Sequence, residues 1–177
     1  MPKIVYYVAA SLDGYISGPE EDISLFVGEG DGVTKYLKDL QDYKTVIMGR
    51  KTYEFGYKYG LKPGQPAYGH MEHYVFSRSL ELPSSHPQVH IEKPSIEKVM
   101  EIRDDSSTDV YLCGGGVFAG WLLDHGLIDM LKVKINPILL GQGVPIFGAS
   151  KTNAKLELRD TELYDNGLQI ATYEFGR

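Results

Sequence analysis

Three short segments of the sequence carry glycines, basic side chains or hydroxyl groups that suit phosphate binding. The first reads Gly-Arg-Lys-Thr and follows the apolar stretch 45–48. A glycine at a strand end lets a phosphate approach the backbone, and the amides of a following helix attract anions. The next three side chains add positive charge and a hydroxyl donor. An ordinary turn with an exposed basic pair is the alternative for these residues, Gly49, Arg50, Lys51 and Thr52.

The second segment is Ser77-Arg78, which follows the apolar pair Val75-Phe76. A hydroxyl and a guanidinium at a strand end suit a phosphate monoester, such as the 2′-phosphate of NADPH. A surface loop without a function would show the same residues. The combination with the first segment favours a nucleotide, because ligands of open α/β sheets bind beyond the carboxyl ends of the strands.

The third segment, 114–116, consists of three consecutive glycines. Such a run is costly in conformational entropy, and its amides can form a nest for an anion, so a functional role is favoured. With Ala119 it also fits the weak G-x-G-x-x-A fingerprint of a Rossmann domain. We exclude that domain, because Asp129 comes too early to be its acidic residue and the remaining chain is typical of hairpins.

Other candidate residues carry weaker signals. Asp13 lies in a turn after the first apolar stretch, where its carboxylate either shapes the turn or faces the site. His70, Glu72 and His73 have metal-binding side chains but no further ligand near them in the sequence, so we expect structural roles and no metal. Cys113 has no base beside it, and we expect a small buried residue under a ligand rather than a nucleophile.

The elements that must position these residues alternate early in the chain and form hairpins late. Strands are expected at 3–11, 45–48, 73–76, 89–91, 109–113, 130–135, 155–164 and 168–175, and helices at 34–43, 95–103 and from 116 to about 125. Asp165-Asn166-Gly167 is a strong hairpin signal. The pattern predicts an α/β fold whose mixed, mostly parallel sheet ends in an antiparallel hairpin.

Length and composition limit the function classes. The chain has 177 residues and a net charge of −6, which predicts one domain over 1–177 and argues against general nucleic-acid binding. The apolar run 4–10 is too short to cross a membrane, and Lys3 alone precedes it, so we expect neither a membrane contact nor a signal peptide. The only cysteine cannot form an internal disulfide, and a cytoplasmic location is therefore expected.

Four motifs in order along the chain resemble the dihydrofolate reductase fold, and in particular the C-terminal reductase domain of the bifunctional riboflavin-biosynthesis deaminase–reductase. They are Ala-Ala-Ser-Leu-Asp-Gly-Tyr-Ile (9–16), Val-Ile-Met-Gly-Arg-Lys-Thr-Tyr-Glu (46–54), Val-Phe-Ser-Arg-Ser (75–79) and Tyr-Leu-Cys-Gly-Gly-Gly-Val-Phe (111–118). The resemblance implies a three-layer fold with helices on both sheet faces, and NADPH as the hydride donor.

The same resemblance implies the roles of individual residues towards NADPH. The segment 49–52 would bind the pyrophosphate and the adenosine side, and Ser77 with Arg78 would hold the 2′-phosphate. Ala10 and the loop from Leu12 to Ile16 would cover the nicotinamide. The third motif would cradle the pyrophosphate and position the nicotinamide, through Gly114, Gly115, Gly116, Val117 and Phe118.

Departures from the family pattern concern the substrate. Gln65 stands where folate-reducing members have an arginine after Pro-Gly, and Ala119 stands in register with a tyrosine. The acid expected on the first helix has no clear match, since Asp31 is out of register and Asp22 lies in a loop. A small pteridine, pyrimidine or flavin-like heterocycle is therefore expected, including one like 5-amino-6-(5-phosphoribosylamino)uracil, although no motif for a ribose phosphate is present. The deaminase signature is absent.

The hypothesis is hydride transfer from NADPH to a C=N or C=O bond, with the proton supplied by Asp13 or a water near it. The alternative is a nucleotide-binding or dimerisation module that keeps the fold and has lost turnover. A homodimer is expected, with the apolar segment 131–140 as its contact face.

Overall fold

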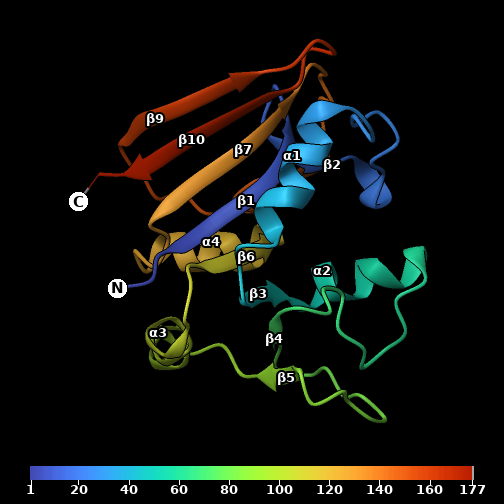
Figure 1. Ribbon diagram of the computed structural model, residues 1–177, viewed down its shortest axis with the longest axis vertical. Coiled ribbons are helices and arrows are strands. Elements are labelled where there is room, and N and C mark those ends of the chain that lie inside the picture. The colour runs from blue at the N-terminus through green and yellow to red at the C-terminus, as the bar shows by residue number, and fades with distance from the viewer. Residues whose placement is uncertain (177) are drawn as a thin grey trace.

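The computed structural model describes residues 1–176 and is built around one eight-stranded sheet (Figure 1). Its strands are β1 (Ile4–Ser11), β3 (Thr45–Gly49), β4 (Glu72–Phe76), β5 (Val89–Glu92), β6 (Val110–Gly114), β7 (Met130–Asn136), β9 (Leu156–Leu163) and β10 (Gln169–Phe175). They lie in the order β5-β4-β3-β6-β1-β7-β10-β9. The first six in this order are parallel, whereas β10 and β9 form an antiparallel hairpin at one edge. The mixed, mostly parallel sheet that the sequence predicts is confirmed.

Strand β1 lies inside the sheet, which explains its nearly continuous apolar sequence. It pairs in parallel with β6 on one side and with β7 on the other, so that Tyr6 lies beside both Leu112 and Leu131. The side chains of Ile4, Val5, Tyr6 and Tyr7 are all buried. A strand covered on both faces needs apolar residues at successive positions rather than at alternate ones.

Helices cover both faces of the sheet. On one face lie α3 (Ile96–Asp105) and α4 (Gly116–Asp124), and on the other lie α1 (Asp31–Leu40) and α2 (Arg50–Phe55). In Figure 1, α1 crosses in front of the strands and α4 lies behind them. Each pair of helices closes its own apolar cluster, the first around Ile102 and Leu122 and the second around Leu40 and Tyr53.

The helix starts differ in how well the sequence predicts them. Ser95 accepts a hydrogen bond from the Lys98 amide and caps α3, as expected. Helix α1, by contrast, begins at Asp31 rather than at Thr34, and no side chain caps it. The Thr34 hydroxyl instead donates to the carbonyl of Gly30, the residue before the helix. The backbone of Gly30 has φ of 108°, which a glycine adopts without strain.

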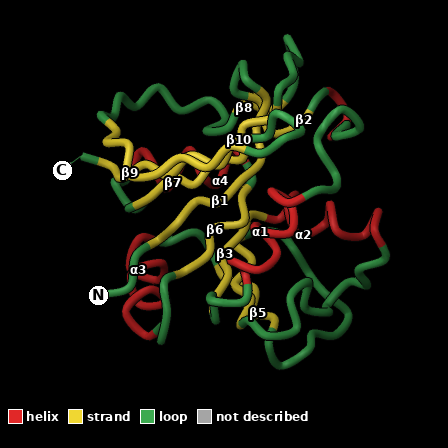
Figure 2. Tube along the Cα trace, turned by 45° about the horizontal axis from the view of Figure 1, so that its top comes forward, coloured by secondary structure: helices red, strands yellow, loops and turns green. Residues whose placement is uncertain are grey.

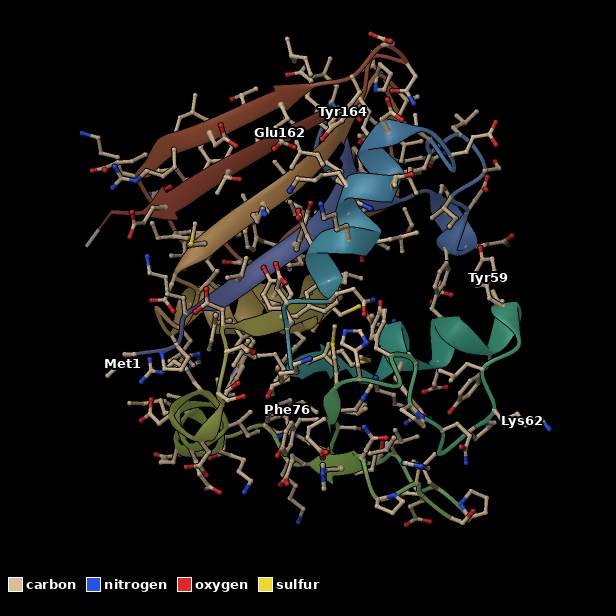
Figure 3. All side chains as sticks on the ribbon, viewed as in Figure 1. Met1, Tyr59, Lys62, Phe76, Glu162 and Tyr164 are labelled. Carbon is tan, nitrogen blue, oxygen red and sulfur yellow. The ribbon has the colours of Figure 1, made fainter. Side chains whose placement is uncertain are left out.

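The hairpin between β9 and β10 confirms the turn signal in the sequence. The Gly167 amide donates to the Tyr164 carbonyl over 2.9 Å, and Gly167 has φ of 86°. The Asn166 side chain accepts a hydrogen bond from the Leu168 amide. Figure 3 shows Tyr164 beside Glu162 near this turn, and the two side chains share a hydrogen bond of 2.6 Å.

Short elements that the sequence did not reveal surround the loops. A second sheet consists of two strands, β2 (Tyr15–Ser17) and β8 (Val144–Pro145). The 3-10 turns η1 (Pro19–Glu21) and η2 (Gly56–Tyr59) lie in the two long loops. These pieces have two to four residues each, too few for a periodic pattern.

The segment 131–140, expected to form a dimer face, is only partly buried, because Leu139 beyond β7 is exposed. Strand β7 lies between β1 and β10, and its Leu131 and Val133 side chains are buried in the core. Leu131 and Val133 are apolar because their side chains fill the core, and they are therefore not available to a second chain. The homodimer stays a prediction without a contact face in β7. Among residues 1–176, no helix is long and apolar enough to cross a membrane.

Candidate functional site

The three segments predicted to bind phosphate lie side by side at one end of the sheet. Gly49, the last residue of β3, is in register with Phe76 at the end of β4, and Met48 is in register with Gly114 at the end of β6. The rings of Phe76 and Phe118 stack with their centroids 4.9 Å apart. This contact joins the second segment to the third.

The glycines of this site are close to other groups in ways that a side chain would obstruct. A Cβ atom at Gly49 would lie 3.1 Å from the Cβ of Phe118, and one at Gly115 would lie 2.9 Å from the hydroxyl oxygen of Thr52. Gly116 serves packing instead, because its Cβ would lie 2.4 Å from the Pro145 carbonyl oxygen. At these first two positions, the lack of a side chain leaves a narrow surface of bare backbone between α2 and α4.

The basic residues of the first two segments point to solvent at the rim of this surface. Arg50 donates to the Ser79 hydroxyl over 2.8 Å and pairs with Glu54 on the next helical turn. Lys51 and Arg78 are exposed. The Ser77 hydroxyl oxygen accepts hydrogen bonds from two amides of its own turn, so it shapes the loop and holds Arg78 near the end of β4.

Asp13 fastens one loop to another. Its carboxylate accepts hydrogen bonds from the Ser11 hydroxyl at 2.6 Å and from the amides of Leu140 and Gly141 at 3.1 and 2.8 Å. The bond from Ser11 and those from the two amides hold the pKa of Asp13 below its usual range. A carboxylate held in this way is ionised at neutral pH and has no proton to give. The contacts favour a positioning role over the proton-donor role that the sequence suggested.

The residues expected to cover a nicotinamide differ in their exposure. Ala10 lies in the core, and its carbonyl accepts a hydrogen bond from the Asn136 side chain. Ile16 is half-buried in β2. Leu12 and Val117 are 67% and 76% exposed, which leaves both side chains accessible to a bound ring.

A cluster of polar side chains that the sequence analysis missed lies under α1, on the same sheet face as Cys113. Tyr36 of α1 shares a hydrogen bond of 2.6 Å with Tyr111 of β6, and the Tyr68 hydroxyl lies 3.7 Å from the sulfur of Cys113. The ammonium nitrogen of Lys134 lies 3.3 Å from the ring centre of Tyr36. We call these five residues the tyrosine–lysine cluster.

His73 supports this cluster from beneath. It is fully buried, its Nε2 accepts a hydrogen bond from the Tyr68 amide, and its Nδ1 donates to the Met71 carbonyl. Its ring also stacks on that of Tyr68. The structural role expected for His73 is thereby confirmed. Burial lowers its pKa to about 4, so the imidazole is neutral.

A cleft lies between the loop after β2 and η2. An open cleft of about 610 Å³ is lined there by residues 19–24 together with Lys58 and Tyr59. The Lys58 ammonium and the Glu21 carboxylate form an ion pair of 3.1 Å across it. Figure 3 shows Tyr59 pointing from the end of η2 towards the segment 19–24, and Figure 2 shows the long loops that surround this side of the sheet.

Comparison with known proteins identifies the family. The sequence pattern of the RibD C-terminal domain matches residues 2–170. The chain belongs to this family. The RibD C-terminal domain therefore spans nearly the whole chain, including the three candidate phosphate-binding segments and the tyrosine–lysine cluster. The predicted resemblance is confirmed.

Two curated relatives from Bacillus subtilis (strain 168) match over nearly their full length. The uncharacterized protein YwjB is 28% identical over 174 residues, with 95% of each chain covered. The uncharacterized protein YyaP is 25% identical over 182 residues, covering 98% of this chain and 95% of YyaP. These relatives share the domain and leave its reaction open.

Solved structures show the same fold. A Shewanella sp. PV-4 protein described as a candidate riboflavin biosynthesis protein has a TM-score of 0.82 at 24% identity, with full coverage of both chains. The dihydrofolate reductase of Enterococcus faecalis, solved with NADP(H), has a TM-score of 0.71 at 15% identity. The match covers 99% of this chain and 97% of that one. A Thermotoga maritima diaminohydroxyphosphoribosylaminopyrimidine deaminase/5-amino-6-(5-phosphoribosylamino)uracil reductase reaches 0.70 at 17% identity, with 99% of this chain matched to 57% of that one. The dihydrofolate reductase-like fold is thus confirmed.

The acidic residues of this RibD C-terminal domain also differ from what the sequence predicted. Asp31 stands at the exposed start of α1, beside the β9–β10 turn. The acid of α1 that faces the sheet is Asp39, which the sequence analysis did not consider. Its carboxylate binds the Tyr7 hydroxyl at 2.9 Å and the ammonium groups of Lys35 and Lys132. Asp39 is saturated by these partners and stabilises the contact between α1 and the sheet.

Proposed function

We propose that this protein is an NADPH-dependent reductase that transfers a hydride to a C=N or C=O bond of a small heterocycle. Membership of the RibD C-terminal domain family, together with reductases of the same fold, supports a reductase-type function. The observation that carries the cofactor proposal is that the three candidate phosphate-binding segments meet at one end of the sheet. A narrow backbone surface lies there between two helix starts, with cationic side chains at its rim.

The chain's residues divide into three groups towards the cofactor. The amides around Gly115 and the start of α4 would bind the pyrophosphate, because free helix amides attract anions. Arg78 would bind the 2′-phosphate, since its guanidinium is exposed and follows the turn that Ser77 shapes. Leu12 and Val117 would contact the nicotinamide with their exposed apolar side chains. The bound cofactor supplies a hydride at C4 of its reduced ring.

The substrate would lie against the tyrosine–lysine cluster. Cys113 of this cluster directly precedes the first glycine of the third segment, so a ring stacked on the nicotinamide meets the cluster first. Phenol hydroxyls and an ammonium group suit the ring nitrogens and carbonyl oxygens of a pteridine, a pyrimidine or a flavin-like heterocycle. A substrate like 5-amino-6-(5-phosphoribosylamino)uracil belongs to this range.

The decisive experiment is a titration of the pure protein with NADPH and NADH, followed by nicotinamide fluorescence and by melting temperature. We expect micromolar binding of NADPH and an affinity for NADH at least tenfold lower, a difference of about 1.4 kcal/mol. Bound NADPH is then tested for oxidation at 340 nm with 7,8-dihydropterin and 5-amino-6-(5-phosphoribosylamino)uracil. Absence of binding by both nucleotides would disprove the cofactor proposal. Binding without oxidation would favour the module that has lost turnover.

A further inference from the structure

Lys134 is a cation without an acidic partner in a largely enclosed position. Its ammonium group lies over the Tyr36 ring, and no carboxylate within residues 1–176 pairs with it. The neighbouring lysine on the same face of β7, Lys132, is paired with Asp39 at 3.4 Å and lies over the Tyr7 ring. The two lysine side chains are of the same length and lie on the same strand, but only that of Lys132 has an acidic partner.

The position of Lys134 connects it to the glycine-containing segments. It lies two residues before the end of β7 and is in register with Ala9 of β1, so both side chains point to the face under α1. On β6, which lies on the other side of β1, Cys113 directly precedes the first glycine of the third segment. The side chains of Ala9 and Cys113, which stand on this face of β1 and β6, are both small. A flat substrate ring that lay over them would reach towards both the ammonium group and those glycines.

We propose that Lys134 is the proton donor of the reduction: its ammonium group protonates the nitrogen or oxygen of the bond that accepts the hydride. This role rests on the proposed function. The hydride leaves C4 of the reduced nicotinamide with its electron pair and bonds to the substrate carbon. The π pair of the C=N or C=O bond moves to the nitrogen or oxygen, which takes a proton from the ammonium. Lys134 becomes a neutral amine and regains its proton from water.

The other titratable groups facing the ammonium are poorer donors near neutral pH. Burial raises the pKa of Tyr36, Tyr111 and Cys113, and the Cys113 thiol together with burial raises that of Tyr68. All four hold their protons too firmly. Burial acts in the opposite direction on Lys134 and lowers its pKa to about 8, close to the pH at which a proton donor works best.

None of the remaining neighbours of Lys134 is a better proton donor. Its companion Lys132 is charged and paired with Asp39, and the residue opposite Lys134 on β10 is the apolar Ile170. Asp13, the earlier candidate, is fixed by three hydrogen bonds as a carboxylate. Within residues 1–176, Lys134 is the group of this sheet face that is charged near neutral pH and has no ionic partner.

The test compares Lys134→Gln and Lys134→Arg with the matched control Lys132→Gln, using NADPH and the two heterocycles named above. We expect Lys134→Gln to lower kcat about 100-fold and to leave the NADPH Kd within about twofold. In the unchanged protein, kcat falls about tenfold per pH unit above pH 8. Lys134→Arg keeps the positive charge but should lower kcat as Lys134→Gln does and show no limb near pH 8, because a guanidinium holds its proton too firmly to donate it. Lys132→Gln keeps the limb. A structural role would change the melting temperature or KM without moving the limb.

A second measurement decides the matter without turnover. Reductive ¹³C-methylation labels the amines, and NMR then follows each amine from pH 6 to 11 in the NADP⁺ complex, with Lys134→Gln used only to assign the signal. Titration near 8 supports the proposal. Titration near the ordinary lysine value of about 10.4 overturns it while NADPH binding, and with it the proposed function, stands. An alkaline limb that persists in Lys134→Gln also overturns it. Failure to bind NADPH, by contrast, refutes the proposed function itself.

Discussion

The hydroxyl oxygen of Thr52 lies 2.9 Å from the place that a Cβ atom would occupy at Gly115. Thr52 belongs to α2 and Gly115 precedes α4, so this proximity joins two helix starts that are far apart in the sequence. The gap is filled by the hydroxyl alone. The Thr52 hydroxyl therefore fixes how closely the two glycine-containing segments approach each other, and hence the width of the backbone surface between them.

Gly115→Ala should fold and lose cofactor affinity. The new methyl group can displace the Thr52 hydroxyl by a small shift, but it then covers the amides that would bind the pyrophosphate. We expect the NADPH Kd to rise at least tenfold, about 1.4 kcal/mol, with a change of a few degrees in melting temperature. Gly69→Ala is the matched control, because no atom lies within 4 Å of its added Cβ. Equal affinities in both variants would contradict this assignment of Gly115.

Arg78→Ala should separate the two nicotinamide cofactors. Its exposed guanidinium would contact a 2′-phosphate that NADH does not have. We expect the NADPH Kd to rise about tenfold or more and that of NADH to remain unchanged, as measured by nicotinamide fluorescence. Arg159→Ala, on β9 beside Glu157 and Glu174, serves as the control for loss of a surface charge. A parallel loss for both cofactors would show that Arg78 does not bind the 2′-phosphate.

His73 should make the fold sensitive to acid. Its pKa is about 4 in the folded chain, and that of an unfolded histidine is about 6.5. The unfolded state therefore binds a proton first as the pH falls, and the stability present above pH 6.5 is lost between 6.5 and 4. The full effect is on the order of 3 kcal/mol in the free energy of unfolding.

Urea denaturation from pH 7.5 to 4 measures this loss. In His73→Gln the part due to the imidazole should disappear, although the variant is less stable throughout because the Tyr68 amide changes its partner. His125→Gln is the control, because His125 is exposed and bonds only to the Trp121 carbonyl on its own helix. An unchanged slope in His73→Gln would rule out His73 as the origin of the acid sensitivity.

Asp13→Asn should loosen the loop at Leu140 and Gly141 without removing a proton donor. An asparagine offers one acceptor oxygen in place of two, so one of the two loop amides loses its partner. We expect hydrogen exchange at these amides to speed up at least tenfold at pH 7, while the pH profile of turnover keeps its shape. Asp165→Asn, in the exposed β9–β10 turn, should alter neither. An acidic limb that vanished in Asp13→Asn would restore the carboxyl group as a participant in proton transfer.

Much of the fold follows from local signals in the sequence. Strand β1 has a run of apolar residues, β7 alternates apolar residues with lysines, and turn residues such as Asn166 and Gly167 mark the hairpin. The candidate phosphate-binding segments could be located for the same reason, since glycine runs and basic residues can each be recognised in the local sequence. The short strands β2 and β8 could not be found, because they exist only through pairing with each other.

The tyrosine–lysine cluster escaped sequence analysis for a different reason. Its members come from α1, a loop, β6 and β7, and nothing in the local sequence distinguishes Lys134 from Lys132. The alternation of lysines along β7 suggests a strand with one solvated face. The structure places that face under α1, where only one of the two charges meets an acid. Such differences depend on tertiary contacts, and they decide which polar residue carries chemistry.

The pairing of β1 with β6 and β7 has a consequence for how the chain is made. A ribosome releases the N-terminus first, and residues 4–11 emerge as an apolar segment without partners. Their neighbours in the sheet, from Val110 and from Met130 onwards, follow only after more than half of the protein has been synthesised. The first strand must therefore wait, shielded by chaperones or by transient contacts, until the last third of the chain encloses it. Nascent chains truncated before residue 130 should accordingly be prone to aggregation.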